Sequence, residues 1–174
     1  MNREALRMTT FRKPSSECEQ MLEIGCGTGE FTRDVLLPWS KPCRKMVAVN
    51  ALRGLIQYAK ANYPHPDISY EVLDAASRDL SNCLNKHGKF DRVYCFYCLY
   101  WIKDQKLALV NVGKLLKDDG ECLFLFVSQF IFTTFGKRWH QWSVGGISLG
   151  IPQKSSRTPG ILSKNQVLKM WRLL

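Results

Sequence analysis

The sequence predicts an α/β fold with an open, mostly parallel sheet. Short apolar segments alternate with longer segments whose apolar residues repeat at helical spacing. A glycine-rich turn follows the first apolar segment, at the place where open parallel sheets bind their ligands. At 174 residues with 45% hydrophobic content, the chain is long enough to bury one sizeable core. We therefore expect a single domain, with a core at about residues 20–128 and a basic tail at 129–174.

Five short segments have the composition of buried strands. Each is a run of apolar, β-branched or aromatic residues bounded by polar or turn-forming residues. They lie at Met21–Ile24, Met46–Val49, Ile68–Leu73, Phe90–Tyr97 and Glu121–Ser128. Because a helical pattern follows each of the first four, we expect the strands to run parallel.

The segments between these strands predict helices. The first is expected to end at Leu37, because Pro38 and Pro42 mark a loop. The last should be stopped by Gly120, since glycine commonly ends helices. The helices are expected at Phe31–Leu37, around Leu52–Ala59, around Leu80–Leu84 and at Gln105–Lys117.

The stretch at residues 21–30, Met-Leu-Glu-Ile-Gly-Cys-Gly-Thr-Gly-Glu, says most about function. Its glycines let the backbone turn sharply and approach a ligand. A dinucleotide-binding turn reads Gly-x-Gly-x-x-Gly, whereas here position 30 is Glu30, whose carboxylate would repel a phosphate. Glu23, two places before the first glycine, instead suits a ligand with a cationic amino group. An ordinary strand-to-helix turn is the structural alternative.

This combination resembles the first motif of class I S-adenosylmethionine-dependent methyltransferases, which have a Rossmann-like sheet. The resemblance implies that Glu23 and the turn hold the methionyl part of S-adenosylmethionine. It also implies that Asn50, where the family has an acidic residue, faces the ribose and that Asp74 meets the adenine amine. A turn asparagine and an exposed turn aspartate are the alternatives. The implied cofactor contacts are Glu23, Gly25, Cys26, Gly27, Thr28, Gly29, Asn50, Ala51, Asp74, Ala75, Cys95 and Phe96.

The segment Lys89–Ile102 carries a narrower resemblance. Its Phe-Asp and Phe-Tyr-Cys-Leu-Tyr-Trp are similar to the Phe-Asp, Phe-Tyr-Cys-Leu-His-Trp segment of arthropod juvenile hormone acid O-methyltransferases. The resemblance implies that Tyr97, Tyr100 and Trp101 contact the substrate; packing in the core or at its rim is the alternative. Tyr100 stands where the family has His, and a phenol with a pKa near 10 is not a base at neutral pH.

The substrate that this resemblance implies is a small lipophilic carboxylic acid, such as a juvenile hormone acid or farnesoic acid. Such an acid is already ionised near pH 7, so methyl transfer needs no general base and we identify no catalytic residue. Catalysis would depend on alignment and on removal of water. The alternatives are a degenerate cofactor-binding protein with little or no turnover and, behind it, a nucleic-acid-binding protein.

The cysteines and the chain's apolar runs bear on its compartment. Seven cysteines without paired spacing indicate reduced thiols in a cytoplasmic protein. Cys95 and Cys98 form a Cys-x-x-Cys, for which a redox pair is an alternative to two packing residues. His65, His87 and His140 are scattered, so no metal site is expected. The longest apolar run, 122–135, is shorter than the roughly 20 residues that span a bilayer, so we expect no membrane span.

The net charge of +10 is concentrated at the C-terminal end of the chain. Glu121 is the last acidic residue, and lysines and arginines interleaved with Trp139, Trp142 and Trp171 follow it. A solvated basic face is the simplest interpretation. Attraction of an anionic substrate and stacking on nucleic acid are the alternatives, and we do not expect nucleic acid as the main partner.

Both ends are expected to be shorter than in the family. Residues 1–18 do not match its N-terminal helical segment, and beyond Ser128 we expect a glycine- and proline-rich loop and a short helix from Lys164 capped by Ser163. The last two strands of the sheet would then be missing. The fifth strand would be an open edge, with Cys122 and Phe124 partly exposed, through which copies of the chain self-associate.

Overall fold

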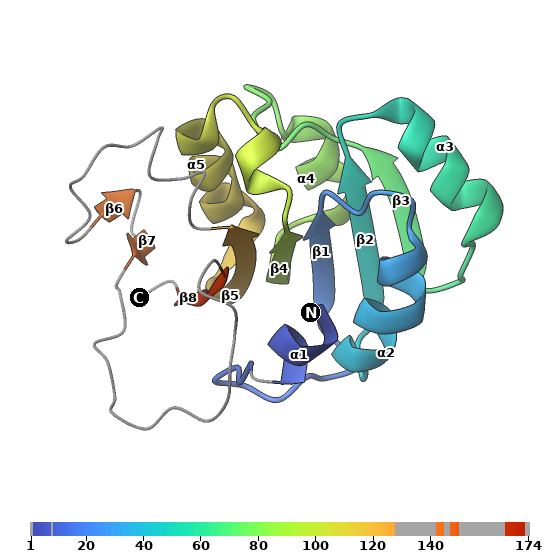
Figure 1. Cartoon of the computed structure of the whole chain (residues 1–174), viewed down its shortest axis with the longest axis horizontal. Helices are drawn as coiled ribbons and strands as arrows, with labels where there is room; N and C mark the ends of the chain where they lie inside the picture. The colour runs from blue at the N-terminus through green and yellow to red at the C-terminus, as the bar shows by residue number, and fades with distance from the viewer. Residues whose placement is uncertain (1, 8, 128–141, 145–146, 150–165, 173–174) are drawn as a thin grey trace.

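The computed structural model describes residues 2–7, 9–127, 142–144, 147–149 and 166–172, with side chains at residues 3, 6–7 and 9–125. Its described strands form a main sheet in the order β3-β2-β1-β4-β5-β8 (Figure 1). The first five strands are parallel, and β8 is antiparallel to β5. The bounds are β1 Gln20–Ile24, β2 Lys45–Asn50, β3 Ile68–Val72, β4 Phe90–Phe96, β5 Leu116–Val127 and β8 Gln166–Arg172. The prediction of a Rossmann-like, mostly parallel α/β sheet is confirmed.

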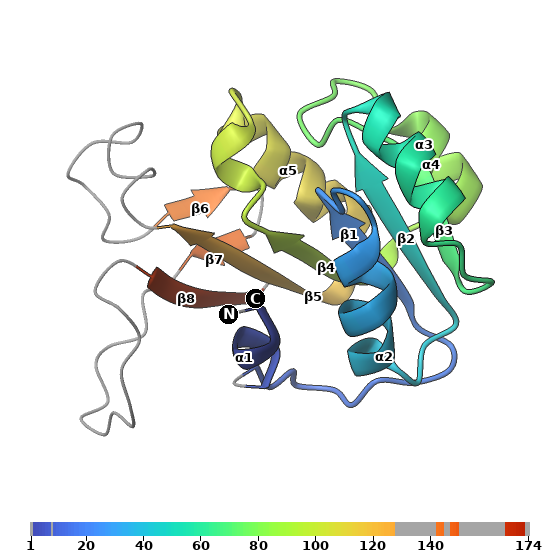
Figure 2. The same ribbon diagram turned by 45° about the vertical axis from the view of Figure 1, so that its right-hand side comes forward.

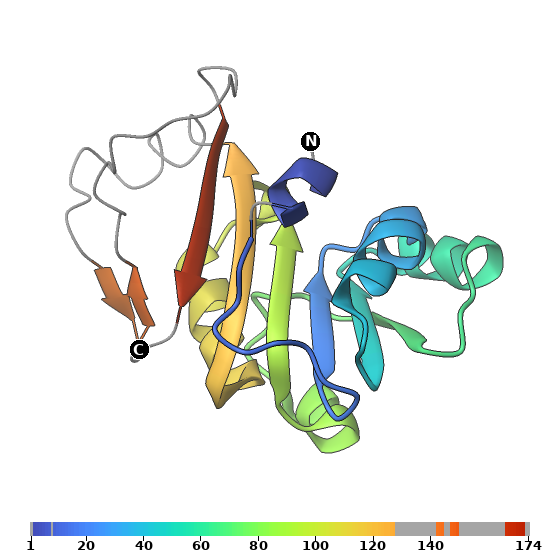
Figure 3. The same cartoon turned by 90° about the horizontal axis from the view of Figure 1, so that it is seen from below.

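The helices lie on both sides of this sheet (Figure 3). Their bounds are α1 Asn2–Arg7, the π-helical turn η1 Thr32–Leu36, α2 Leu37–Ser40, α3 Arg53–Asn62, α4 Ser81–His87, the 3-10 turn η2 Leu99–Trp101 and α5 Gln105–Leu115. A separate antiparallel pair is formed by β6 Trp142–Val144 and β7 Ile147–Leu149. Among the described residues, no helix combines the length and apolar character needed to cross a membrane.

Two apolar layers cover the two faces of the sheet. Successive strand residues point to opposite faces, so Leu22 and Ile24 pack with α4 and α5, whereas Met21 packs with α1, α2 and α3. The central strands β1, β2 and β4 read as nearly continuous apolar runs because both of their faces are buried. This double burial holds the strand ends, and the loops that follow them, in fixed relative positions.

The N-terminal segment crosses the amino end of the sheet. Helix α1 places Leu6 in the core. Arg92, buried near the start of β4, donates from Nη1 to Ser15 Oγ at 2.6 Å and from Nη2 to the Lys13 carbonyl oxygen at 2.5 Å. Its guanidinium also lies 4.3 Å from the centre of the Phe11 ring. These contacts hold the segment away from the carboxyl ends of the strands.

The first helical region is longer than the sequence predicts. The chain remains helical through α2 to Ser40, so Pro38 lies inside a helix and the prediction of a loop beginning there is wrong. Pro38 lies near the start of α2, where its fixed φ suits a helix. Burial of Leu36 and Leu37 against the sheet outweighs the local signal of the proline.

The boundary between α5 and β5 also differs from the prediction. Helix α5 begins with a cap, since the Leu107 N–H donates to Asp104 Oδ1 at 2.9 Å, but it ends at Leu115. Gly120 therefore does not stop a helix. It lies in β5 where the register with β4 shifts, between the pairs Phe90–Leu116 and Arg92–Glu121. Glycine is needed there because a Cβ would lie 2.8 Å from the Leu116 side chain and 3.0 Å from the Lys117 carbonyl oxygen.

The C-terminal part corrects two further predictions. Residues 166–172 form strand β8 instead of a helix, and β8 pairs with β5 from Val127–Gln166 to Glu121–Arg172 (Figure 2). One of the two strands expected to be missing is thus present, and β5 is not an open edge. Cys122 and Phe124 are buried, which contradicts their predicted exposure. The predicted cap Ser163 and the glycine- and proline-rich positions lie outside the described residues, and self-association stays a prediction.

We expect Gly120→Val to destabilise the fold. The added side chain would overlap the Leu116 side chain and two carbonyl oxygens, and such overpacking costs about 1–3 kcal/mol. Gly54→Ala in α3 is the matched control, because nothing lies within 4 Å of its added Cβ, and alanine in a helix should stabilise by up to about 1 kcal/mol. Urea unfolding measures both variants, and a Gly120→Val protein as stable as the parent would contradict this packing.

Candidate functional site

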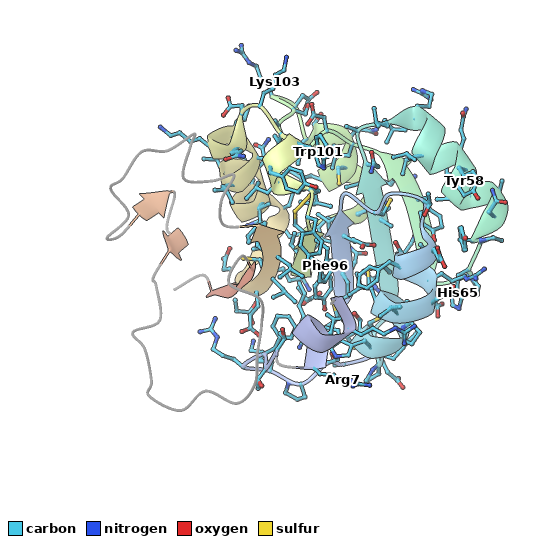
Figure 4. The ribbon with its side chains drawn as sticks, viewed as in Figure 1. Arg7, Tyr58, His65, Phe96, Trp101 and Lys103 are labelled. Atoms are coloured by element: carbon cyan, nitrogen blue, oxygen red, sulfur yellow. A yellow bond between two sulfur atoms is a disulfide. The ribbon has the colours of Figure 1, made fainter. Side chains whose placement is uncertain are left out.

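A cavity of about 830 Å³ opens at the carboxyl ends of the central strands. Pockets that hold drug-sized ligands range from about 300 to 1,000 Å³. Figure 4 shows Phe96 near the middle of the molecule, and Trp101 nearer the end toward which the arrowheads of β1 and β2 point in Figure 1. The lining residues are Gly25, Gly27, Asn50, Ala51, Leu52, Leu55, Asp74, Ala76, Phe96, Tyr97, Cys98, Trp101, Ile102, Lys103 and Asp104.

The glycine-rich turn forms one wall and is tied to the neighbouring strand. The N–H groups of Gly25 and Cys26 both donate to the Val49 carbonyl oxygen, at 2.8 and 3.1 Å. A Cβ on Gly29 would lie 2.8 Å from the Ala59 side chain, so Gly29 is needed for packing. Gly27 has φ of 59° and nothing within 4 Å of its position for a Cβ. Gly27 is therefore where the backbone itself faces open space in the cavity wall.

Glu23 lies beneath this turn and does not line the cavity. It is 2% exposed, and Thr32 Oγ1 donates to Glu23 Oε2 at 2.5 Å. Burial raises the pKa of the Glu23 carboxyl from 4.5 to about 7, because the ionised form loses its hydration, while the Thr32 hydrogen bond lowers it. Because this pKa is near neutrality, a cation that approaches the turn would shift Glu23 toward its ionised form.

Asn50 and Asp74 occupy equivalent places after β2 and β3. Asn50 Oδ1 accepts from the Leu52 N–H at 2.9 Å, and Asp74 Oδ1 accepts from the Ala76 N–H at 2.9 Å. Each side chain thus uses one oxygen to shape its own turn. The second polar atom of each remains for a ligand, an amide nitrogen in Asn50 and a carboxylate oxygen in Asp74.

The structure brings eight of the predicted site residues into the cavity wall and leaves seven outside it. The lining group is Gly25, Gly27, Asn50, Ala51, Asp74, Phe96, Tyr97 and Trp101. The residues that do not line it are Glu23, Cys26, Thr28, Gly29, Ala75, Cys95 and Tyr100. Some of these have structural contacts instead: Ala75, for example, is buried, and its carbonyl oxygen accepts from Asn111 Nδ2 at 2.8 Å.

The cavity wall also contains residues that sequence reasoning missed. They are Leu52, Leu55, Ala76, Cys98, Ile102, Lys103 and Asp104. Leu52 and Trp101 are 63% and 77% exposed, and the Trp101 ring lies 4.8 Å from that of Tyr100. A large apolar residue two positions after a strand, such as Leu52 after β2, was the signal that could have been used. The mouth of the cavity therefore exposes apolar surface, as a site for a lipophilic molecule requires.

Helix α5 supports the two loops that follow β3 and β4. Asn111 Nδ2 donates to the carbonyl oxygens of Ala75 and Ser77, at 2.8 and 2.7 Å. Gln105 Nε2 donates to the Leu99 carbonyl oxygen at 3.1 Å. Because both amides are buried, these hydrogen bonds hold the loops of the cavity wall against the helix.

Two cysteines beside the cavity differ from the prediction of reduced thiols. Cys95 on β4 and Cys98 form a disulfide, whereas Cys26, Cys43 and the other described cysteines are free. These two cysteines are therefore bonded to each other, and the alternative of a redox pair stays a prediction. Within residues 2–7, 9–127 and the later described strands, no group of three or more histidine, cysteine or acidic side chains is placed to hold a metal ion.

Comparison with known proteins identifies the family. The family described as Methyltransferase domain matches residues 22–124, which cover most of the strands β1 to β5. The chain belongs to this family. Juvenile hormone acid O-methyltransferase of Bombyx mori is 32% identical over 130 residues, 71% of this chain and 46% of the relative. Malonyl-[acyl-carrier protein] O-methyltransferase of Acetivibrio thermocellus is 24% identical over 150 residues, 86% of this chain and 49% of the relative.

Solved methyltransferase structures share the fold. An S-adenosylmethionine-dependent methyltransferase from Mesorhizobium loti superposes with a TM-score of 0.55 at 20% identity, covering 71% of this chain and 52% of that one. A TehB-like methyltransferase from Corynebacterium glutamicum gives a TM-score of 0.53 at 20% identity, covering 67% and 59%. The prediction of S-adenosylmethionine as the cofactor is confirmed. The chain spans less than half the length of the curated relatives named above, at 46% and 49%.

We expect Gly27→Val to weaken S-adenosylhomocysteine binding at least about tenfold, because its side chain would project into the cavity. Gly88→Val is the matched control. Gly88 also has a positive φ and nothing within 4 Å of an added Cβ, but it lies outside the cavity wall. Both substitutions strain the backbone, and Gly88, at φ of 73° and ψ of −159°, lies in a region that is almost exclusive to glycine. Calorimetric titration compares them, and equal affinities would show that Gly27 does not approach the ligand.

The raised pKa of Glu23 predicts a pH-dependent stability. Between pH 4.5 and about 7 the unfolded chain loses the Glu23 proton while the folded protein keeps it, so the free energy of unfolding falls as pH rises. The shift corresponds to roughly 3 kcal/mol. We expect Glu23→Gln to lack this part of the decline, since its amide oxygen can still accept from Thr32. Urea unfolding across this pH range tests the idea, and parallel curves for the two proteins would contradict it.

Proposed function

We propose that this chain provides the cofactor and substrate site of an O-methyltransferase whose methyl acceptor is a small lipophilic carboxylic acid, such as a juvenile hormone acid or farnesoic acid. The observation that carries the proposal is one cavity lined by two kinds of group. The glycine turn, Asn50 and Asp74 are polar, and Phe96, Trp101 and Leu52 are apolar. The first suits S-adenosylmethionine and the second suits the hydrocarbon part of an acid.

The polar residues of the site fit the cofactor. Gly27 presents backbone without a Cβ, which leaves room for the methionyl part of the molecule. Glu23 lies below the turn, and the cationic amino group would favour its ionised form. Asn50 and Asp74 each keep one polar atom for the ribose hydroxyls and the adenine amine. When bound, the cofactor supplies an electrophilic methyl group on a sulfonium.

The protein's part in the reaction is to align the acid and exclude water. A carboxylic acid is ionised near pH 7, so its oxygen is a nucleophile without help from a base. Tyr97, whose phenol pKa is raised by burial, remains protonated and cannot act as one. Phe96 and Ile102 present apolar groups to the cavity and so keep water from the carboxylate. Holding the acid in line with the methyl group lowers the entropic part of the activation barrier.

The choice of a lipophilic acid has two supports. Trp101 and Leu52 expose apolar area at the cavity mouth, which favours a hydrocarbon chain over a charged one. The relatives from Bombyx mori and Drosophila melanogaster, at 32% and 31% identity, are named for methylation of juvenile hormone acid. The segment around Tyr100 that resembles those enzymes contributes to the same cavity.

A second candidate function is cofactor binding with little or no turnover. Asn50 favours it, because its Oδ1 already accepts from the Leu52 N–H and its other polar atom is a donor instead of a charged acceptor. The two functions differ in one measurable step, the transfer of the methyl group. The described residues add no support for nucleic-acid binding, and the side chains of the basic tail lie outside them.

Two measurements on the purified chain separate these functions. Titration calorimetry with S-adenosylhomocysteine tests the cofactor site, and we expect saturable binding to one site. Transfer of a labelled methyl group from S-adenosylmethionine to farnesoic acid, with farnesol as the matched alcohol, tests the reaction. Methylation of the acid but not of the alcohol supports the proposed enzyme. Binding without transfer supports the second candidate, and absence of binding contradicts both.

We expect Asn50→Asp to tighten S-adenosylhomocysteine binding. The aspartate can keep one oxygen on the Leu52 N–H and turn the other, now charged, to the ribose hydroxyls. A charged acceptor exceeds a neutral one by roughly 1 kcal/mol, which corresponds to about fivefold in affinity. Calorimetry measures the change, with Asn62→Asp on the exposed end of α3 as the control for added charge. A weaker or unaltered dissociation constant would mean that Asn50 does not face the ribose.

A further inference from the structure

The hydroxyl of Tyr97 is a buried polar group that lacks a partner on the protein. No described residue forms a hydrogen bond with it, although its atom is buried from solvent. The other two buried side-chain atoms in this condition, Gln105 Oε1 and Asn111 Oδ1, belong to amides whose nitrogens are bonded. Leaving a buried hydroxyl unpaired costs about 1–3 kcal/mol. Tyr97 also lines the cavity, and a turn of its side chain would bring the hydroxyl to a bound ligand that supplies the missing partner.

The backbone holds Tyr97 in an unusual conformation. Its φ of 54° lies in the left-handed region. Among the described residues, every other residue with a positive φ is a glycine. Such a conformation costs about 1–3 kcal/mol in a residue with a side chain and persists only where the surroundings enforce it. Here the Tyr97 N–H donates to the Leu125 carbonyl oxygen at 2.7 Å, and the bonded Cys95 and Cys98 flank the residue. The backbone position of Tyr97 is therefore set before a ligand binds.

The surroundings of Tyr97 determine which group it can receive. The ring packs against the apolar layer that contains Phe96 and Leu125. Burial raises the pKa of the phenol, so the hydroxyl is protonated at neutral pH and acts as a donor. A protonated donor in an apolar environment binds most strongly to a charged acceptor, because hydrogen bonds to ionised groups are shorter and stronger than neutral ones. The best-matched acceptor is a carboxylate.

We propose that the Tyr97 hydroxyl donates a hydrogen bond to the carboxylate of a molecule bound in the cavity and so positions that molecule. This inference rests on the proposed function and adds a named atom to it. Two sources offer the same chemistry, the acid that accepts the methyl group and the methionyl carboxylate of the cofactor. The bond would favour acids over the corresponding alcohols or esters, which lack the charge.

The test compares Tyr97→Phe with Tyr58→Phe, which removes a half-exposed hydroxyl on α3, away from Phe96 and Trp101 (Figure 4). For each protein we measure S-adenosylhomocysteine affinity, KM and kcat with farnesoic acid, and the thermal midpoint without ligand. Tyr97→Phe should leave the midpoint unchanged or raise it, since it removes an unpaired buried hydroxyl. It should weaken one ligand by about tenfold or more, while Tyr58→Phe changes neither.

The ligand that weakens identifies the source. A raised KM for the acid with unchanged S-adenosylhomocysteine affinity assigns the bond to the methyl acceptor, and weakened S-adenosylhomocysteine binding assigns it to the cofactor. Unchanged values for both ligands overturn the inference while the proposed function stands. A lowered thermal midpoint with unchanged binding overturns it too, because the hydroxyl then has a structural partner. If the parent protein does not bind S-adenosylhomocysteine, the proposed function fails and the inference falls with it.

Discussion

The site depends on two backbone hydrogen bonds that join the ends of β1 and β2. The N–H groups of Gly25 and Cys26 converge on the Val49 carbonyl oxygen, so the glycine turn cannot move without the end of β2. This link places Gly27 and Asn50 on the same cavity. Only a backbone in the left-handed region can leave β1 in this way, and Gly25, with φ of 80°, supplies it.

Two loops of the cavity wall are held by a different interaction, their support by α5. Asn111 and Gln105 hold the loops after β3 and β4, and both amides are buried in the layer between helix and sheet. The cavity therefore lies between a turn fixed by backbone bonds and loops fixed by side-chain bonds. Such a frame is rigid before a ligand arrives, which lowers the entropic cost of binding.

Two buried polar groups lie close to this cavity. Glu23 lies beneath the turn with a pKa raised to about 7, and the buried hydroxyl of Tyr97 has no hydrogen-bond partner among the described residues. Each arrangement costs folding free energy and each would be relieved by one part of a ligand, a cation near Glu23 and an anion near Tyr97. The amino acid part of the cofactor carries both charges, and a carboxylic acid carries the second. Stability and binding are therefore coupled through these two side chains.

The sequence by itself determined the α/β class, the five parallel strands and the glycine turn, because apolar periodicity and turn chemistry are local properties. It also placed Asn50 and Asp74 at strand ends. Only the tertiary structure decided where α5 ends, that Pro38 lies in a helix and that residues 166–172 form β8. A strand next to β5 satisfies backbone groups that a helix would leave unpaired, and no local pattern reports that demand. The same holds for Leu52, Cys98 and Ile102, which meet in the cavity because packing brings distant loops together.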